Sequence, residues 1–162
     1  MARCLIVGCG CRGLALAGEL RARGHAVRGT TRDPARRTEL EAAGVEPHIG
    51  DPDRVATLAP AFAHAGVACL LLGSAQGSPE QLGALHGTRL DMLLERMLDT
   101  TVRGVVYERA GTLDPELLAR GGERIRHACE RSLIPFVLLD VAPADHAAWL
   151  VAALAGVEQI LS

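Results

Sequence analysis

The chain has 162 residues, of which 49% are hydrophobic, and its formal net charge is -2. A single domain with a sizeable core is therefore expected. The chain has no excess of positive charge that would favour binding to nucleic acid or to an anionic membrane surface. The longest apolar stretch, 147–157, is shorter than a membrane span, and Met1 leads into a strand pattern without a secretory signal. Five cysteines without a disulfide-framework spacing favour a reducing cytoplasm.

Lysine is absent from the sequence, so all 17 residues counted as lysine or arginine are arginines. A Walker A loop, a Schiff-base site and a catalytic Tyr–Lys pair each depend on a lysine side chain. These three kinds of chemistry are therefore excluded in their usual form.

The first strand pattern, over 4–7, runs directly into three glycines with the spacing G-x-G-x-x-G, namely Gly8, Gly10 and Gly13. A helix pattern over 14–23 and a strand pattern over 26–31 follow, which is the order of a dinucleotide-binding βαβ unit. The first glycine allows a tight turn, the second lets the pyrophosphate approach the backbone, and the third allows close helix–strand packing. The pyrophosphate is expected at the amino end of the helix, near Cys11 and Arg12.

Helix and strand patterns alternate along the rest of the chain. In order, they are a helix over 34–43, a strand over 45–49, a helix over 53–65, a strand over 67–72, a long helix over 79–99, a strand over 104–107, a helical region over 115–131 interrupted at Gly121 and Gly122, a strand over 135–139 and a helix over 145–161. Six strands separated by helices predict a doubly wound parallel sheet, because parallel neighbours need crossover connections. The expected strand order is 3-2-1-4-5-6, in a single domain over 1–162.

The second strand ends in Thr30, Thr31 and Arg32. This strand end faces the adenosine ribose in a dinucleotide-binding sheet. Here it offers two hydroxyl groups and a guanidinium, which can hold a phosphate through two hydrogen bonds. The pattern favours NADP(H) over NAD(H). S-adenosylmethionine is the main alternative ligand, but its sites prefer an acidic residue at this position.

The residues that follow the second, third and fourth strands each have two possible roles. Asp33 is near the spacing of a ribose-binding carboxylate, but its place before Pro34 is typical of a helix cap. Asp51 follows the third strand and either approaches the adenine or forms a cap or turn. Gly73 and Ser74 follow the fourth strand, where a turn or a contact to the ribose is expected.

These segments resemble the atypical short-chain dehydrogenase/reductases, the NmrA-like and epimerase-like NAD(P)-binding proteins. The likeness is carried by Leu5-Ile-Val-Gly-Cys-Gly, Val27-Arg-Gly-Thr-Thr-Arg-Asp-Pro-Ala-Arg, Ile49-Gly-Asp51 and the stretch 104–111. It extends over nearly the whole chain as a pattern, and its specific part is the first 33 residues. The resemblance implies a Rossmann fold with NADP(H) contacts from Gly8, Gly10, Gly13, Thr31 and Arg32.

The chain departs from this family where reductase chemistry is usually carried. Family enzymes that reduce carbonyls use Tyr-x-x-x-Lys on a helix, with a serine or threonine at the end of the fifth strand. Here the one tyrosine, Tyr107, falls inside a predicted strand, and Glu108, Arg109 or Ala110 takes the place of the serine. Tyr107 and Glu108 remain catalytic candidates. Glu108 beside Arg109 would act as an acid or base, or else form a structural ion pair.

Two functions follow from these observations: an NADP(H)-dependent oxidoreductase or epimerase-like enzyme without the usual Tyr–Lys pair, and a non-catalytic NADP(H) redox sensor. Cys9 and Cys11 either form a redox-sensitive site or simply fill small positions in the glycine motif. The six histidines show no ligand spacing, so no metal site is expected. The apolar last helix and the helix over 79–99 are candidate homodimer contacts.

Overall fold

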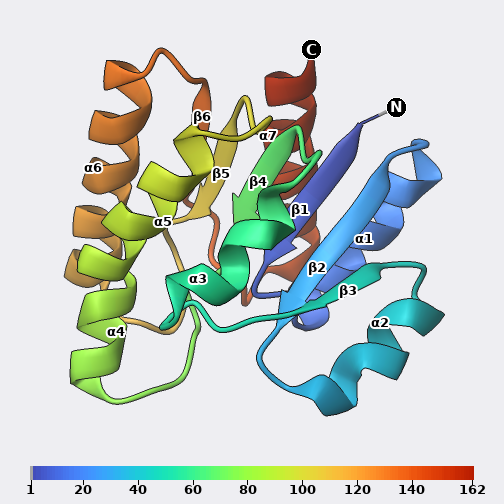
Figure 1. Ribbon diagram of the computed structural model, residues 1–162, viewed down its shortest axis with the longest axis horizontal. Coiled ribbons are helices and arrows are strands. Elements are labelled where there is room, and N and C mark those ends of the chain that lie inside the picture. The colour runs from blue at the N-terminus through green and yellow to red at the C-terminus, as the bar shows by residue number, and fades with distance from the viewer. Residues whose placement is uncertain (1) are drawn as a thin grey trace.

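The computed structural model describes residues 2–162 and places a parallel sheet between two layers of helices (Figure 1). The strands are β1 (Arg3–Val7), β2 (Ala26–Thr31), β3 (Glu46–Ile49), β4 (Val67–Leu70), β5 (Val105–Glu108) and β6 (Phe136–Leu139). They lie in the order β3-β2-β1-β4-β5-β6, which confirms the doubly wound sheet that the alternating patterns predict.

Helices cover both faces of this sheet and bury a separate apolar cluster on each. They are α1 (Cys11–Ala22), α2 (Arg37–Ala42), α3 (Val55–Leu58), α4 (Pro79–Leu85), α5 (Thr88–Leu98), α6 (Pro115–Arg131) and α7 (His146–Leu161), with short 3-10 turns η1 (Pro34–Arg36) and η2 (Ala59–Phe62). One cluster lies under α1, α2 and α7, and the other under α3, α5 and α6. Within residues 2–162, none of the helices has both the length and the apolar character needed to cross a membrane.

The central strands are buried on both sides because the helix layers leave them no contact with water. Cys4 of β1 pairs in register with Val27 of β2 and Val67 of β4, at the centre of the sheet. Cys4 and Cys69 are both fully buried, as expected for core residues. Burial raises the pKa of the Cys4 thiol to about 12.

Three helices predicted as continuous are divided in the structure. The one over 34–43 begins as the 3-10 turn η1 and continues as α2. The helix predicted over 79–99 is divided into α4 and α5, because His86 turns into the core and Gly87 takes a non-helical backbone conformation with a φ of −124°. The helix predicted over 53–65 shortens to α3 followed by the 3-10 turn η2, which has a proline in its first turn. The break between α4 and α5 follows from the burial of His86, and the one between α3 and η2 coincides with a proline.

The predicted interruption at Gly121 and Gly122 is wrong, because α6 runs through both glycines without a break. A Cβ added at Gly121 would overlap the hydroxyl of Tyr107, and one added at Gly122 would lie 2.7 Å from Cδ of Arg109. The pair is therefore explained by the close approach of α6 to β5 rather than by a turn.

Candidate functional site

The turn between β1 and α1 requires glycine at its first position. Gly8 has a φ of 83°, a value that residues with a side chain rarely adopt. A Cβ added to Gly8 would also lie only 2.7 Å from the carbonyl oxygen of Leu71, just after β4. The Gly8 N–H donates a hydrogen bond of 3.1 Å to Oγ1 of Thr30 in β2. The turn is thus fixed against the strands on both sides of β1.

The other two glycines of the motif have the distinct environments that their predicted roles require. A Cβ added at Gly10 would meet no other atom within 4 Å, so the backbone is open on this side. A Cβ added at Gly13 would lie 3.2 Å from both Sγ of Cys9 and Cγ2 of Ile6, so this glycine lets α1 pack closely on β1. An open second glycine and a closely packed third one fit the approach of a pyrophosphate to the amino end of α1.

Of the two motif cysteines, Cys9 is a packing residue. It is only 1% exposed, and its Sγ lies so near Gly29 of β2 that a Cβ there would be 2.8 Å away. Burial raises the pKa of the Cys9 thiol to about 11, so the thiol is protonated at neutral pH. Cys11, at the first position of α1, is exposed.

A cavity of about 360 Å³ lies at the carboxyl ends of β1 to β4. Its volume falls within the range of about 300–1,000 Å³ that is typical of small-molecule sites. Nine of the ten residues predicted to bind the cofactor line it, namely Gly8, Gly10, Cys11, Arg12, Gly13, Thr31, Arg32, Asp51 and Ser74. The tenth, Gly73, does not line the cavity. The structure therefore brings residues from four separate loops to one place.

At the β2 end of the cavity, Asp33 acts as the predicted cap. Its Oδ1 accepts a hydrogen bond of 2.9 Å from the N–H of Ala35 at the start of η1. The Asp33 N–H in turn donates to Oγ1 of Thr31 at 3.2 Å, which orients the threonine at the end of β2. Asp33 still lines the cavity beside the exposed Arg32.

A second arginine, Arg36, lines the same end of the cavity and was not predicted from the sequence. Its Nη1 donates a hydrogen bond of 2.7 Å to the carbonyl oxygen of Cys9, which ties η1 to the glycine turn. Its Nε donates to Glu39 at 3.0 Å, and this hydrogen bond raises the pKa of Arg36 above its usual value. Two guanidinium groups, those of Arg32 and Arg36, thus lie at the end of the cavity next to β2.

Asp51 follows β3 and lines the cavity next to Asp53. Its Oδ1 accepts a hydrogen bond of 2.9 Å from the Asp53 N–H, so the side chain closes a turn. The Asp51 N–H donates to Oγ1 of Thr57 at 2.8 Å, which fixes the loop to α3. The turn predicted for Asp51 is present, and the residue also lines the cavity.

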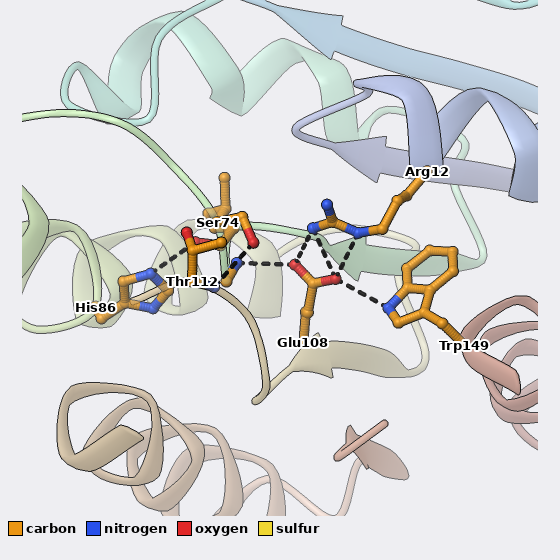
Figure 2. A network of polar contacts seen from close by, with 8 residues as sticks. Arg12, Ser74, His86, Glu108, Thr112 and Trp149 are labelled. Carbon is orange, nitrogen blue, oxygen red and sulfur yellow. Dashed lines mark hydrogen bonds and ion pairs between the residues drawn. The ribbon is translucent and has the colours of Figure 1, made fainter. Parts of the chain in front are cut away.

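Glu108, at the end of β5, has no exposed surface and is the acceptor at the centre of a buried polar network (Figure 2). Its Oε1 accepts from Nη2 of Arg12 at 2.8 Å and from the N–H of Gly73 at 2.9 Å. Its Oε2 accepts from Nε of Arg12 at 3.2 Å and from Nε1 of Trp149 at 3.0 Å. The Arg12 guanidinium also lies 5.5 Å from the centre of the Trp149 ring, within the range of a cation–π contact. One carboxylate therefore connects α1, the loop after β4, β5 and α7.

This network corrects the sequence interpretation of Glu108 in one respect. Glu108 forms an ion pair, but with Arg12 rather than with its neighbour Arg109. Arg109 instead pairs with Asp140 at the end of β6, where Nε and Oδ1 are 2.6 Å apart. This contact holds the pKa of the Asp140 carboxyl below its usual value. Successive residues of a strand point to opposite faces of the sheet, which is why Glu108 and Arg109 have different partners.

The structure does not bring Tyr107 to the cavity. The residue is fully buried, and its hydroxyl lies 2.6 Å from Nδ1 of His86. His86 Nε2 lies 3.0 Å from the carbonyl oxygen of Leu72. Burial lowers the pKa of His86, so the ring is neutral and can accept from the tyrosine while donating to Leu72. Burial also raises the pKa of Tyr107. This geometry makes Tyr107 an anchor for the loop after β4 and removes it as a proton donor in the cavity.

Comparison with known proteins identifies the fold of the chain. No family model and no curated protein matches the chain. Among solved structures, it is similar to a short-chain dehydrogenase/reductase superfamily protein from Agrobacterium tumefaciens with bound NAD, at 18% identity and a TM-score of 0.68, covering 84% of this chain and 48% of that one. It is also similar to the Citrobacter sp. triphenylmethane reductase in complex with NADP(H), at 19% identity and a TM-score of 0.65, covering 85% and 48%.

A third similar structure is the UDP-glucose 4-epimerase of Thermotoga maritima with UDP-glucose, at 11% identity and a TM-score of 0.70, covering 84% of this chain and 54% of that one. The chain thus spans about half the length of the proteins that it resembles. Its six-stranded sheet has the Rossmann fold, which is the fold that it shares with these short-chain dehydrogenase/reductase and epimerase structures.

Proposed function

We propose that the chain is an NADP(H)-binding protein of the atypical short-chain dehydrogenase/reductase group. The observation that carries this proposal is the glycine turn of Gly8 and Gly10, which opens on a cavity with Arg32 and Arg36 at its β2 end. In doubly wound sheets, dinucleotides bind at this edge of the sheet. Similar structures of the same fold contain NAD or NADP(H), which supports the same ligand class here.

The two arginines favour NADP(H) over NAD(H) in this proposal. Arg32 is exposed beside the cavity, and Arg36 is held next to the glycine turn by its bond to Cys9. A guanidinium can hold a phosphate through two charge-assisted hydrogen bonds. Asp33, the carboxylate nearest to them along the chain, already accepts a hydrogen bond from the η1 backbone.

Whether the bound dinucleotide is used in a reaction is a separate question with two candidate answers. An enzyme of this group would be an oxidoreductase or epimerase-like enzyme, and the bound nicotinamide would supply the hydride chemistry. The burial of Tyr107 and the occupied hydrogen bonds of Glu108 favour a non-catalytic NADP(H) sensor instead. Consumption of NADPH with a panel of carbonyl substrates, followed by absorbance, tests for the oxidoreductase. An epimerase-like enzyme would return the hydride to its product, so it is tested by the conversion of a sugar nucleotide to its epimer.

The phosphate preference is tested by replacing the two arginines separately. Arg32→Ala and Arg36→Ala are each expected to weaken NADPH binding by about tenfold, because each removes a hydrogen bond to a charged group. NADH binding should change little in Arg32→Ala, since NADH lacks the 2′-phosphate. Arg36→Ala also removes the hydrogen bond to the Cys9 carbonyl, so it is expected to weaken NADH binding too, but less than NADPH binding. Isothermal titration calorimetry with both nucleotides measures the two affinities.

The matched control is Arg37→Ala, which removes an exposed arginine that does not line the cavity. It should bind NADPH as the parent protein does. Unchanged NADPH affinity in both Arg32→Ala and Arg36→Ala would show that neither arginine holds the phosphate.

A further inference from the structure

The cavity occupies only one half of the sheet edge. A doubly wound sheet is built from two mononucleotide-binding halves, and a dinucleotide lies across both. Here the lining comes from the ends of β1, β2 and β3, the loop after β4 and helix α4. In the part of the chain that the structure describes, no residue after Leu85 lines the cavity. The ends of β5 and β6, which belong to the second half, contribute nothing to it.

An ion pair crosses the sheet edge at the boundary between the two halves. The Arg12 side chain extends from the first turn of α1 to Glu108 at the end of β5 (Figure 2). Between them, the N–H of Gly73 after β4 donates to the same carboxylate. Trp149 donates to Glu108 from α7, so both carboxylate oxygens are occupied. The backbone and side chains at this boundary are therefore held to one another, and of the three residues that bind Glu108 only Arg12 lines the cavity.

The loops after β4 and β5 also lie in direct backbone contact. The N–H of Leu113 donates to the carbonyl oxygen of Gly73 at 3.2 Å, and the N–H of Thr112 donates to Oγ of Ser74 at 3.1 Å. A Cβ added at Gly73 would lie 2.5 Å from the carbonyl oxygen of Ala110, and one added at Gly111 would overlap the Gly73 backbone. The two glycines thus allow a contact that leaves no space for a ring between these loops.

We infer that this site recognises the 2′-phosphorylated ADP part of its ligand and leaves the nicotinamide part outside the cavity. The inference rests on the proposed function, because it assigns the cavity to one half of NADP(H). The ligand class is then any nucleotide that carries 2′-phospho-ADP, whatever its other end. A sensor built in this way responds to the total NADP pool and does not distinguish NADP⁺ from NADPH.

The test is calorimetric titration of the full chain with four compounds: NADPH, NADP⁺, 2′-phospho-ADP-ribose and nicotinamide mononucleotide. The first three are expected to bind within about threefold of one another, which corresponds to less than 1 kcal/mol, and the fourth is expected not to bind. NADPH binding more than about tenfold tighter than 2′-phospho-ADP-ribose would overturn the inference while leaving the proposed function intact. If none of the four binds, both fail.

Arg109→Gln provides a second readout at the ends of β5 and β6. It removes the ion pair with Asp140, which lies outside the cavity. Its ratio of NADPH to 2′-phospho-ADP-ribose affinity should equal that of the parent protein. A change in this ratio would place the nicotinamide against the second half of the sheet and would contradict the inference.

Discussion

Replacing Glu108 with alanine is expected to lower the free energy of unfolding by about 3–5 kcal/mol, as is typical when one partner of a buried ion pair is removed. The reason is the number of donors that depend on this carboxylate. Arg12, the N–H of Gly73 and the indole N–H of Trp149 all donate to it, and Glu108 itself has no exposed surface. Each donor left without an acceptor in a buried place adds its own cost. Urea denaturation followed by Trp149 fluorescence and by circular dichroism measures the change.

Two variants serve as controls: one removes the charge of Glu108 but keeps its shape, and the other removes a more exposed ion pair. Glu108→Gln keeps the size and one acceptor oxygen, so it should cost less than the alanine variant. Asp140→Ala removes the carboxylate of the more exposed Arg109–Asp140 pair, which is worth about 1 kcal/mol or less. A loss of under about 1 kcal/mol in Glu108→Ala would contradict the role assigned to the network.

Gly121→Ala is expected to destabilise the protein by about 3 kcal/mol, through overpacking at a rigid contact. The added Cβ would overlap the Tyr107 hydroxyl, and that hydroxyl is fixed by its hydrogen bond to His86. Alanine is otherwise the better helix former, so a neutral or stabilising effect would arise only if the contact were loose. Gly83→Ala in α4 is the matched control, because a Cβ there meets no atom within 4 Å.

The contact between Gly121 and Tyr107 can be isolated with a double-mutant cycle. Tyr107→Phe alone leaves Nδ1 of His86 without its donor and should cost about 1–3 kcal/mol. In the double variant the hydroxyl that blocks the alanine is gone, so the combined loss should be smaller than the sum of the two single losses. Additive losses would show that the side chains do not meet.

The sheet could be predicted from the sequence because its signals are local. Short apolar runs bounded by glycine identify the buried strands, and their alternation with helices sets the topology. The glycine motif was predictable for the same reason, since Gly8, Gly10 and Gly13 act through the backbone within six residues. The cap at Asp33 could also be predicted, because an aspartate before a proline is a local signal for the start of a helix.

The parts that were not predictable depend on contacts between distant segments. The indole of Trp149 reaches Glu108 across 41 positions of sequence, and Arg12 reaches it across 96. No local pattern encodes these partners, so the neighbour Arg109 was the natural but wrong choice. The break at His86 has the same origin, because burial against Tyr107 overrides a continuous helix pattern. Arg36 could have been predicted to line the site, because it lies only four positions after Arg32 in the sequence.

Dinucleotide binding at the glycine turn is tested most directly by a calorimetric titration of Gly10→Val with NADPH. A Cβ at Gly10 meets no other atom within 4 Å, so the variant should fold, but its side chain would stand where the pyrophosphate approaches the backbone. Gly18→Ala, on an exposed position of α1, is the control and should bind as the parent protein does. Gly10→Val is expected to keep the urea midpoint of the parent protein and to lose NADPH binding by about a hundredfold or more, nearly 3 kcal/mol. A folded Gly10→Val that binds NADPH as tightly as the parent protein would show that the glycine turn does not hold the dinucleotide.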